Sequence, residues 1–225
     1  MQKFLIILFL GLISISSLTA SNPDEPKLLV EKTYGPHLLA TTFVNSFPGN
    51  NNQYFNNWSE GVVLLSNGER VKIKHIRYNC LQDELLWLRP ADYQTSTVLK
   101  TSVNEFIVFD AENKPCYFKK EKFRDWYMLD STFVFFHVLV EGDISFYVHH
   151  KALNIDKNSR ELTRKDFYYI KSGKQLKAIK LRRSSIFNCG FFDKEKMREI
   201  IRKNHLRVRK EEDMMKAIDL YNAAS

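Results

Sequence analysis

The chain has 225 residues and a formal net charge of +8, and 44% of its residues are hydrophobic. This length allows one fair-sized hydrophobic core or two small ones, and the lack of internal repeats and low-complexity tracts excludes repeat and low-complexity architectures. Positive charge is concentrated late in the chain, because residues 171–210 contain fourteen Lys and Arg against three acids.

The first twenty residues have the order of a secretory signal peptide. Lys3 is their only charge, an unbroken apolar run follows at positions 4–13, and small polar residues come next. The run is too short to cross a bilayer of about 30 Å as a helix, which needs about 20 apolar residues. We therefore expect cleavage after Ala20 and a mature chain without a transmembrane span, located in the periplasm or associated with the outer membrane.

The first predicted strands follow a polar stretch. Residues 21–53 begin and end with segments rich in Pro and Asn, and we expect them to form a flexible segment. Residues 62–65 and 70–74 then flank Asn67 and Gly68. This dipeptide predicts a hairpin with a type I′ turn, which requires positive φ at both of its central positions.

The phase of the apolar positions changes after this hairpin. Ile73 and Ile76 have opposite parity, and a strand exchanges its two faces only where a residue is inserted, so we predict a bulge near positions 74–75. A turn is expected at 82–83, and the apolar run at 85–88 predicts a strand buried on both faces.

Alternating and aromatic segments predict six further strands. They lie at 104–109, 115–118, 133–140, 144–150, 167–170 and 175–181. Glycine-containing turns at 141–143 and 172–173 join the last four as two hairpins.

The end of the chain has helical character. Residues 193–204 place apolar residues on one face and have Asp193 in the N-cap position, and a second helix is expected at 210–221 with acids in its first turn. The elements together predict an α+β fold that is mainly antiparallel β. We expect a body at 54–181, built as a sheet sandwich or a partly open barrel, and a basic helical segment at 182–225.

Three cysteines are an odd number for an exported protein. Cys80, Cys116 and Cys189 allow at most one intramolecular disulfide, and their spacing does not match that of a zinc site. We expect buried, unpaired thiols and no metal or cofactor, with one disulfide as the alternative.

The chain contains no nucleophile elbow, HExxH, Walker or Rossmann glycine motif. Two weaker arrangements remain as the basis of a hydrolase site, from Asp83, Glu84, His137 and His149. Paired acids suit a glycosidase if they lie about 5–10 Å apart across a sugar, but a solvated turn acid followed by a strand edge is the explanation we favour for Asp83 and Glu84.

Imidazoles are the second arrangement. Counting back from the turn at 141–143 pairs Val140 with Ser145 and His137 with Val148, which brings His137 near His149 or His150. Adjacent strand residues point to opposite faces, so at most one of the two joins His137. The alternative is that these histidines serve packing or lie on the surface.

Aromatic residues provide a further possibility. Trp58 and Trp126 are suited to stacking on sugar rings if they are exposed, whereas core packing accounts for most of the remaining rings.

The segments QYFNNWSEGVVLL and VKIKHIRYNCLQDELLWL resemble a pattern found in uncharacterised exported proteins of Bacteroidota. The shared positions are Tyr54, Asn56, Trp58, Gly61, Arg77, Tyr78, Asn79 and Asp83, and the ending is similar at Tyr221 and Asn222. Trp58 departs from the phenylalanine usual in that family. The resemblance implies a Gram-negative envelope location, but it brings no biochemical activity or catalytic residues with it. We interpret Arg77, Tyr78 and Asn79 as the structural signature of a bent strand.

Three hypotheses follow for the function. The first is a non-enzymatic accessory protein that docks on an envelope protein complex, such as an outer-membrane or secretion-channel assembly. Its contacts are predicted at Arg182, Arg183, Arg202, Lys203, Arg207, Arg209 and Lys210. The second is a binder of anionic glycan or lipid headgroups through the same residues, and the third is the hydrolase. An exported chain is not expected to meet nucleic acid, and a basic surface that only maintains solubility is the simplest alternative.

Overall fold

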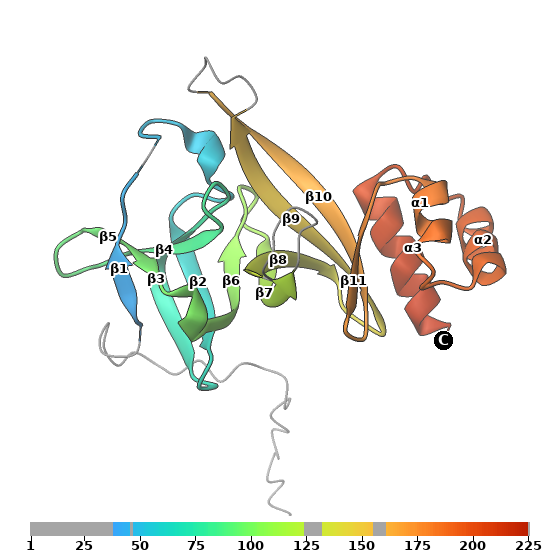
Figure 1. The fold of residues 1–225 in the computed structure, drawn as a ribbon, viewed down its shortest axis with the longest axis horizontal. Coiled ribbons are helices and arrows are strands. Elements are labelled where there is room, and N and C mark those ends of the chain that lie inside the picture. The colour runs from blue at the N-terminus through green and yellow to red at the C-terminus, as the bar shows by residue number, and fades with distance from the viewer. Residues whose placement is uncertain (1–37, 46, 124–131, 155–160, 225) are drawn as a thin grey trace, which may run out of the picture.

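The structure is a computed structural model that describes residues 38–45, 47–123, 132–154 and 161–224 (Figure 1). The predicted signal peptide, most of the segment expected to be flexible, and Trp126 lie outside the described residues.

One antiparallel sheet of eleven strands forms the body. The strands are β1 (Ala40–Thr42), β2 (Ser59–Leu65), β3 (Arg70–Asn79), β4 (Glu84–Leu88), β5 (Thr95–Val98), β6 (Val103–Phe109), β7 (Pro115–Phe123), β8 (Thr132–Val140), β9 (Ile144–Asn154), β10 (Leu162–Ser172) and β11 (Gln175–Ile179). Their order in the sheet is β1-β5-β4-β3-β2-β6-β7-β8-β9-β10-β11. The predicted fold class is confirmed, and the described strands form one open sheet rather than a closed barrel.

Three helices lie at the end of the sheet farthest from β1 (Figure 1). They are α1 (Arg183–Asn188), α2 (Lys194–Lys203) and α3 (Glu211–Ala223), and two 3-10 turns, η1 (Asn51–Gln53) and η2 (Lys100–Ser102), lie within the body. The predicted cap of α2 is confirmed, because Asp193 Oδ1 accepts a hydrogen bond of 2.7 Å from Lys196 N. Helix α1 was not predicted.

The β2–β3 hairpin forms as predicted, but its turn type is different. Of the two turn residues only Gly68 has a positive φ, at 86°, and Gly68 N donates to Leu65 O at 3.0 Å. The connection therefore has three residues and ends in a left-handed glycine, which excludes the type I′ turn.

The predicted bulge in β3 is confirmed. Ser59 lies opposite Ile76 and Gly61 opposite Ile73, so β3 contains one residue more than β2 over this interval. Lys74 and His75 are both exposed, as expected where a strand exchanges its faces.

Two large hydrophobic cores lie along the sheet, together with a small cluster that comprises Val134, Phe136, Tyr147 and Tyr169. The first core comprises Val63, Leu65, Ile73, Ile76, Tyr78, Cys80, Leu85, Trp87, Val98, Val103, Phe106, Val108, Cys116, Phe118, Phe135, Ala152 and Leu162. The second core comprises Val140, Ile144, Phe146, Ile170, Ile179, Ile186, Cys189, Phe192, Met197, Ile201, Leu206, Val208, Met214, Ala217 and Ile218. The first is enclosed by the sheet itself, whereas the second lies between the sheet and the helices.

The sheet curls around the first core. Ala152 N in β9 donates a hydrogen bond of 3.1 Å to Cys80 O, although four strands separate β9 from β3 in the sheet. This curl allows residues far apart in the sequence to share one core, and burial of their apolar area is the main favourable term in folding.

The described end of the segment 21–53 contains secondary structure. Strand β1 pairs with β5, a strand that was not predicted, and Gln53 in η1 is buried. Short polar strands such as β5 carry little hydrophobic periodicity, which explains why the pair was missed.

All three cysteines are buried and unpaired, as expected. Within the described residues, no helix combines the length and the apolar character that a membrane crossing requires.

Candidate functional site

The seven predicted contact residues are all exposed. Arg182 and Arg183 lie at the start of α1, Arg202 and Lys203 lie near the end of α2, and the loop 207–210 before α3 carries the other three. The structure thus places them on the helical end of the molecule, each available to a partner.

These residues belong to a larger exposed set. Twelve of the fourteen Lys and Arg residues in 171–210 are exposed, and we call them the basic surface. Its members are Lys174, Lys177, Lys180, Arg182, Arg183, Lys194, Arg198, Arg202, Lys203, Arg207, Arg209 and Lys210. Two acids contact members of this set: Glu195 pairs with Arg198, and Asp213 accepts a hydrogen bond from the backbone N of Arg207.

The helices that carry the basic surface are fixed to the sheet. Tyr221 Oη accepts a hydrogen bond of 2.9 Å from Asp193 N at the start of α2, and the Tyr221 ring contacts Phe192 edge to face. Asn222 Nδ2 donates to Ile144 O at 2.8 Å. Tyr221 and Asn222, the two residues of the similar ending, therefore join α3 to α2 and to β9.

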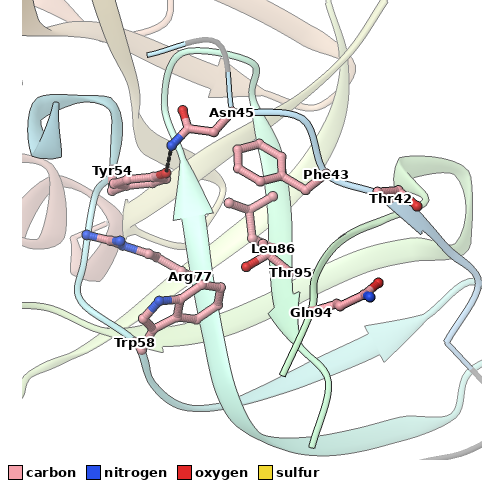
Figure 2. A pocket seen from close by; sticks show the side chains of 9 residues that line it. All are labelled: Thr42, Phe43, Asn45, Tyr54, Trp58, Arg77, Leu86, Gln94 and Thr95. Atoms are coloured by element: carbon pink, nitrogen blue, oxygen red, sulfur yellow. Dashed lines mark hydrogen bonds between the residues drawn. The ribbon is translucent and has the colours of Figure 1, made fainter. Parts of the chain in front are cut away.

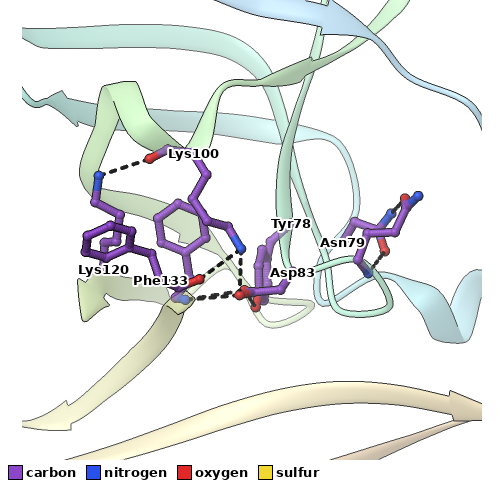
Figure 3. A network of polar contacts seen from close by, with 8 residues as sticks. Tyr78, Asn79, Asp83, Lys100, Lys120 and Phe133 are labelled. Atoms are coloured by element: carbon purple, nitrogen blue, oxygen red, sulfur yellow. Dashed lines mark hydrogen bonds and ion pairs between the residues drawn. The ribbon is translucent and has the colours of Figure 1, made fainter. Parts of the chain in front are cut away.

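Asp83 is not the solvated turn acid of the simplest interpretation. It is a partly buried acceptor at the centre of a polar network (Figure 3), in which Tyr78 Oη donates to its Oδ1 at 2.6 Å and Lys100 Nζ donates to its Oδ2 at 2.8 Å. Phe135 N also donates, at 3.3 Å. Burial raises the pKa of Asp83, in spite of the neighbouring ammonium group of Lys100.

Both carboxylate oxygens of Asp83 accept hydrogen bonds within this network. It joins the β3–β4 turn to η2 and to β8, which are distant in the sequence. Glu84, the adjacent acid, accepts instead from Thr97 Oγ1 at 3.4 Å. The two acids consequently have separate hydrogen-bond partners.

His137 meets His150, as one of the two predicted pairings requires. Their Nδ1 and Nε2 atoms are 3.2 Å apart, and His150 Nδ1 is 2.6 Å from Asp166 Oδ1. The predicted pair of His137 with Val148 is confirmed, but Val140 lies opposite Phe146 rather than Ser145, because the register shifts between Val138 and Val140.

Aromatic rings enclose the imidazole of His137. It stacks on Phe118 at 5.0 Å and meets Phe55 edge to face at 5.7 Å. Burial, with the neighbouring His150, lowers the pKa of His137 to about 3. A neutral imidazole packed between aromatic rings is suited to a structural role in the core. It is poorly suited to proton transfer near neutral pH, because its pKa lies far below that pH.

His149 lies on the other face of the sheet, beside Phe136 at 5.5 Å between ring centroids. It is 3% exposed, and neither ring nitrogen has a hydrogen-bond partner among the described residues. Burial lowers the pKa of His149 to about 3. The four residues of the hydrolase hypothesis are therefore not brought together. No group of three or more His, Cys, Asp or Glu suited to a metal ion occurs in the described part of the chain.

A cleft of about 550 Å³ lies among the first strands of the sheet order (Figure 2). Its lining consists of Thr42, Phe43, Asn45, Tyr54, Trp58, Arg77, Leu86, Gln94 and Thr95. Arg77 and Leu86 lie opposite each other in register, on the face of the sheet that points away from the first core.

Arg77 lies between two aromatic rings in this cleft (Figure 2). Its guanidinium carbon is 3.6 Å from the ring centroid of Tyr54 and 5.9 Å from that of Trp58. Arg77 Nε donates a hydrogen bond of 2.8 Å to Asn56 O. Tyr54, Asn56, Trp58 and Arg77 were all noted in the sequence, but Arg77 was given a purely structural role. The contacts of Arg77 with Tyr54 and Trp58 depend on how the chain folds back, which the sequence does not reveal.

Other residues of the family-like pattern support the backbone. Asn56 Oδ1 accepts a hydrogen bond of 2.9 Å from Tyr78 N, and Asn79 Oδ1 accepts one of 3.0 Å from Leu81 N in the following turn. A Cβ atom on Gly61 would lie 2.5 Å from Ile107 O. These positions explain the pattern as a bent strand with its caps, which agrees with the interpretation from sequence.

Comparison of the chain with protein-family models, with curated proteins and with solved structures gives no match.

Proposed function

We propose that this protein is a non-enzymatic, exported accessory protein of the Gram-negative cell envelope that docks on an acidic protein complex through the basic surface. The exposure of all seven predicted contact residues is the observation that carries the proposal. An outer-membrane or secretion-channel assembly is the kind of partner we infer. The signal-peptide pattern supports the compartment.

The charge of the helical end favours a large acidic partner. Exposed Lys and Arg raise the local concentration of an oppositely charged surface and accelerate its association. The cations extend over β11, α1, α2 and the loop before α3 rather than around one cavity, which suits contact with another macromolecule better than capture of a small substrate. The second core beneath them holds the helices in place, so a partner meets a preformed surface.

Affinity capture tests the proposal. The full mature chain, tagged at its N-terminus, is immobilised and exposed to envelope extracts at low and at high salt, and retained proteins are identified by mass spectrometry. We expect one defined acidic assembly to be retained at low salt and released at high salt, because screening weakens contacts between exposed charges. Direct binding of the purified assembly then has to reproduce the retention.

Two other results would replace the proposal. Retention of vesicles with acidic headgroups or of purified anionic envelope glycan, without any protein assembly, would make the chain a binder of those groups. Failure to retain protein, vesicle or glycan would leave the basic surface a device for solubility, and the docking proposal would be wrong.

A further inference from the structure

The cleft around Arg77 has the dimensions and lining of a binding site for a small molecule. Its volume of about 550 Å³ falls within the range of about 300–1,000 Å³ that such sites occupy. It lies among β1, β3, β4 and β5, at the opposite end of the sheet from the helices (Figures 1 and 2). It is thus separate from the basic surface, and an occupant has no need to meet the docked partner.

The cleft contains a cation without a counter-charge. Arg77 is the one charged residue among the nine that line it, and Arg77 forms no ion pair with any of the described residues. The ring of Tyr54 and the carbonyl of Asn56 fix the orientation of its guanidinium group. An oriented guanidinium group in a half-buried position favours a carboxylate, which it can bind through two parallel hydrogen bonds.

The other residues that line the cleft indicate what the rest of the ligand is. Phe43 and Trp58 offer apolar ring surface, and the buried Leu86 forms part of the wall. Four neutral polar residues complete the lining, namely Thr42, Asn45, Gln94 and Thr95. Aromatic faces together with hydroxyl and amide groups suit a ring that carries several hydroxyl groups, because each such group needs a hydrogen-bond partner when water is displaced.

We propose that this cleft binds an acidic sugar, a uronic acid or the end of a glycan that contains one. The sugar carboxylate lies on the guanidinium group of Arg77, and the sugar ring lies against Trp58. Gln94 contributes its amide nitrogen as a donor, since its Oε1 already accepts a hydrogen bond of 3.0 Å from Arg89.

Calorimetric titration of the full mature chain tests this site, with D-glucuronate as the probe and D-glucose and acetate as comparison compounds. We expect saturable binding of glucuronate and binding of both comparison compounds that is about tenfold weaker or more, because each lacks one of the two recognition elements. Arg77→Gln should weaken glucuronate binding by about tenfold or more. Arg70→Gln, which removes the same charge from an exposed position of the same strand, should leave it unchanged.

Several results would overturn the proposal. Equal affinity for glucose and glucuronate would show that the carboxylate is not recognised. Equal affinity for acetate and glucuronate would show that the sugar ring is not recognised. If glucuronate at tens of millimolar shows no saturable binding, the cleft is not a binding site for it. If Arg77→Gln does not fold, Trp58→Phe keeps an aromatic ring in the cleft and should weaken glucuronate binding several-fold, so unchanged affinity in that variant would also contradict the proposal.

Discussion

The side-chain amide of Asn222 makes two hydrogen bonds with the backbone of Ile144: its Oδ1 accepts from Ile144 N at 3.1 Å and its Nδ2 donates to Ile144 O at 2.8 Å. The last turns of α3 are thereby attached to the start of β9. The helices also cover the second core, so a chain without residues 193–225 would expose that core. Function at the helical end is therefore best tested by surface charge changes that keep the helices in place.

Replacement of Asn222 by Ala should lower the free energy of unfolding by about 1–3 kcal/mol, because two backbone groups lose their partner. Gly142→Ala should be destabilising as well, since its Cβ would lie 2.4 Å from Asn222 Nδ2 and displace the amide. Urea denaturation of both single variants and the double variant measures the coupling. We expect the cost of Gly142→Ala to fall clearly in the Asn222→Ala background. Additive effects, or no effect of Asn222→Ala, would contradict this attachment, and Asp219→Asn on the exposed face of α3 is the control.

Tyr78 is predicted to serve stability rather than chemistry. Tyr78→Phe should cost about 1–2 kcal/mol, because the partly buried Asp83 loses a donor at 2.6 Å. Tyr78→Ala should cost about 3–5 kcal/mol, since Tyr78 is 0% exposed in the first core. Chemical denaturation gives both values, with Tyr93→Phe, at a residue that is 78% exposed, as the control. A Tyr78→Phe variant as stable as the wild type would show that the network of Figure 3 does not support the fold.

His149 should make stability depend on pH. Its pKa is about 3 in the folded protein and about 6.5 in the unfolded chain, so the unfolded chain binds the additional proton between these values. Stability should therefore fall as pH decreases below about 6.5, by up to about 1.4 kcal/mol per pH unit from this residue. His149→Leu should flatten the dependence and leave stability at pH 7 unchanged or higher, because two unpartnered nitrogens are removed. Denaturation curves between pH 4 and pH 7 measure this, with the exposed His75→Gln as the control; identical slopes in wild type and His149→Leu would disprove it.

Gly61 is required by the close approach of β2 and β6. An added Cβ would lie 2.5 Å from Ile107 O and 2.5 Å from Ile76 Cγ2, and a backbone atom cannot move aside without disturbing the sheet. Gly61→Ala should destabilise the protein by about 1–3 kcal/mol. Thermal denaturation beside Ser66→Ala, an exposed change in the same hairpin, checks this, and equal melting temperatures would contradict the close approach.

Features that depend on neighbouring residues were predictable from the sequence. The bulge at Lys74 and His75 follows from the change of parity in one strand, and the cap at Asp193 follows from the start of one helical pattern. Such features need no knowledge of which strands pair, and the structure confirms them.

Features that depend on distant residues were not predictable. The role of Asp83 depends on contacts with Lys100 and with the backbone of Phe135. Nothing in a single sequence identifies either residue as a partner of Asp83. The cleft requires β1 and β5 to pair, and it requires Tyr54 and Trp58, in the segment between η1 and β2, to approach Arg77 in β3. Contacts between residues far apart in the sequence depend on strand register and on bulges. A register shift of one residue moves every side chain of a strand to the opposite face of the sheet.

The basic surface is the central element of the proposed function, and a charge-matched pair of variants tests it most directly. The first variant reverses four exposed charges at the helical end, with the substitutions Arg182→Glu, Arg183→Glu, Arg207→Glu and Arg209→Glu. The second reverses four exposed charges elsewhere on the sheet, with the substitutions Arg70→Glu, Lys74→Glu, Lys122→Glu and Lys165→Glu. Both carry the same net charge, and circular dichroism confirms that both are folded.

The measurement is the amount of acidic envelope assembly that each immobilised protein retains at low salt. Docking through the basic surface predicts that the wild type and the second variant retain it equally and that the first variant loses it. Equal retention by both variants, or equal loss in both, would contradict the account, because binding would then not depend on where the charges lie.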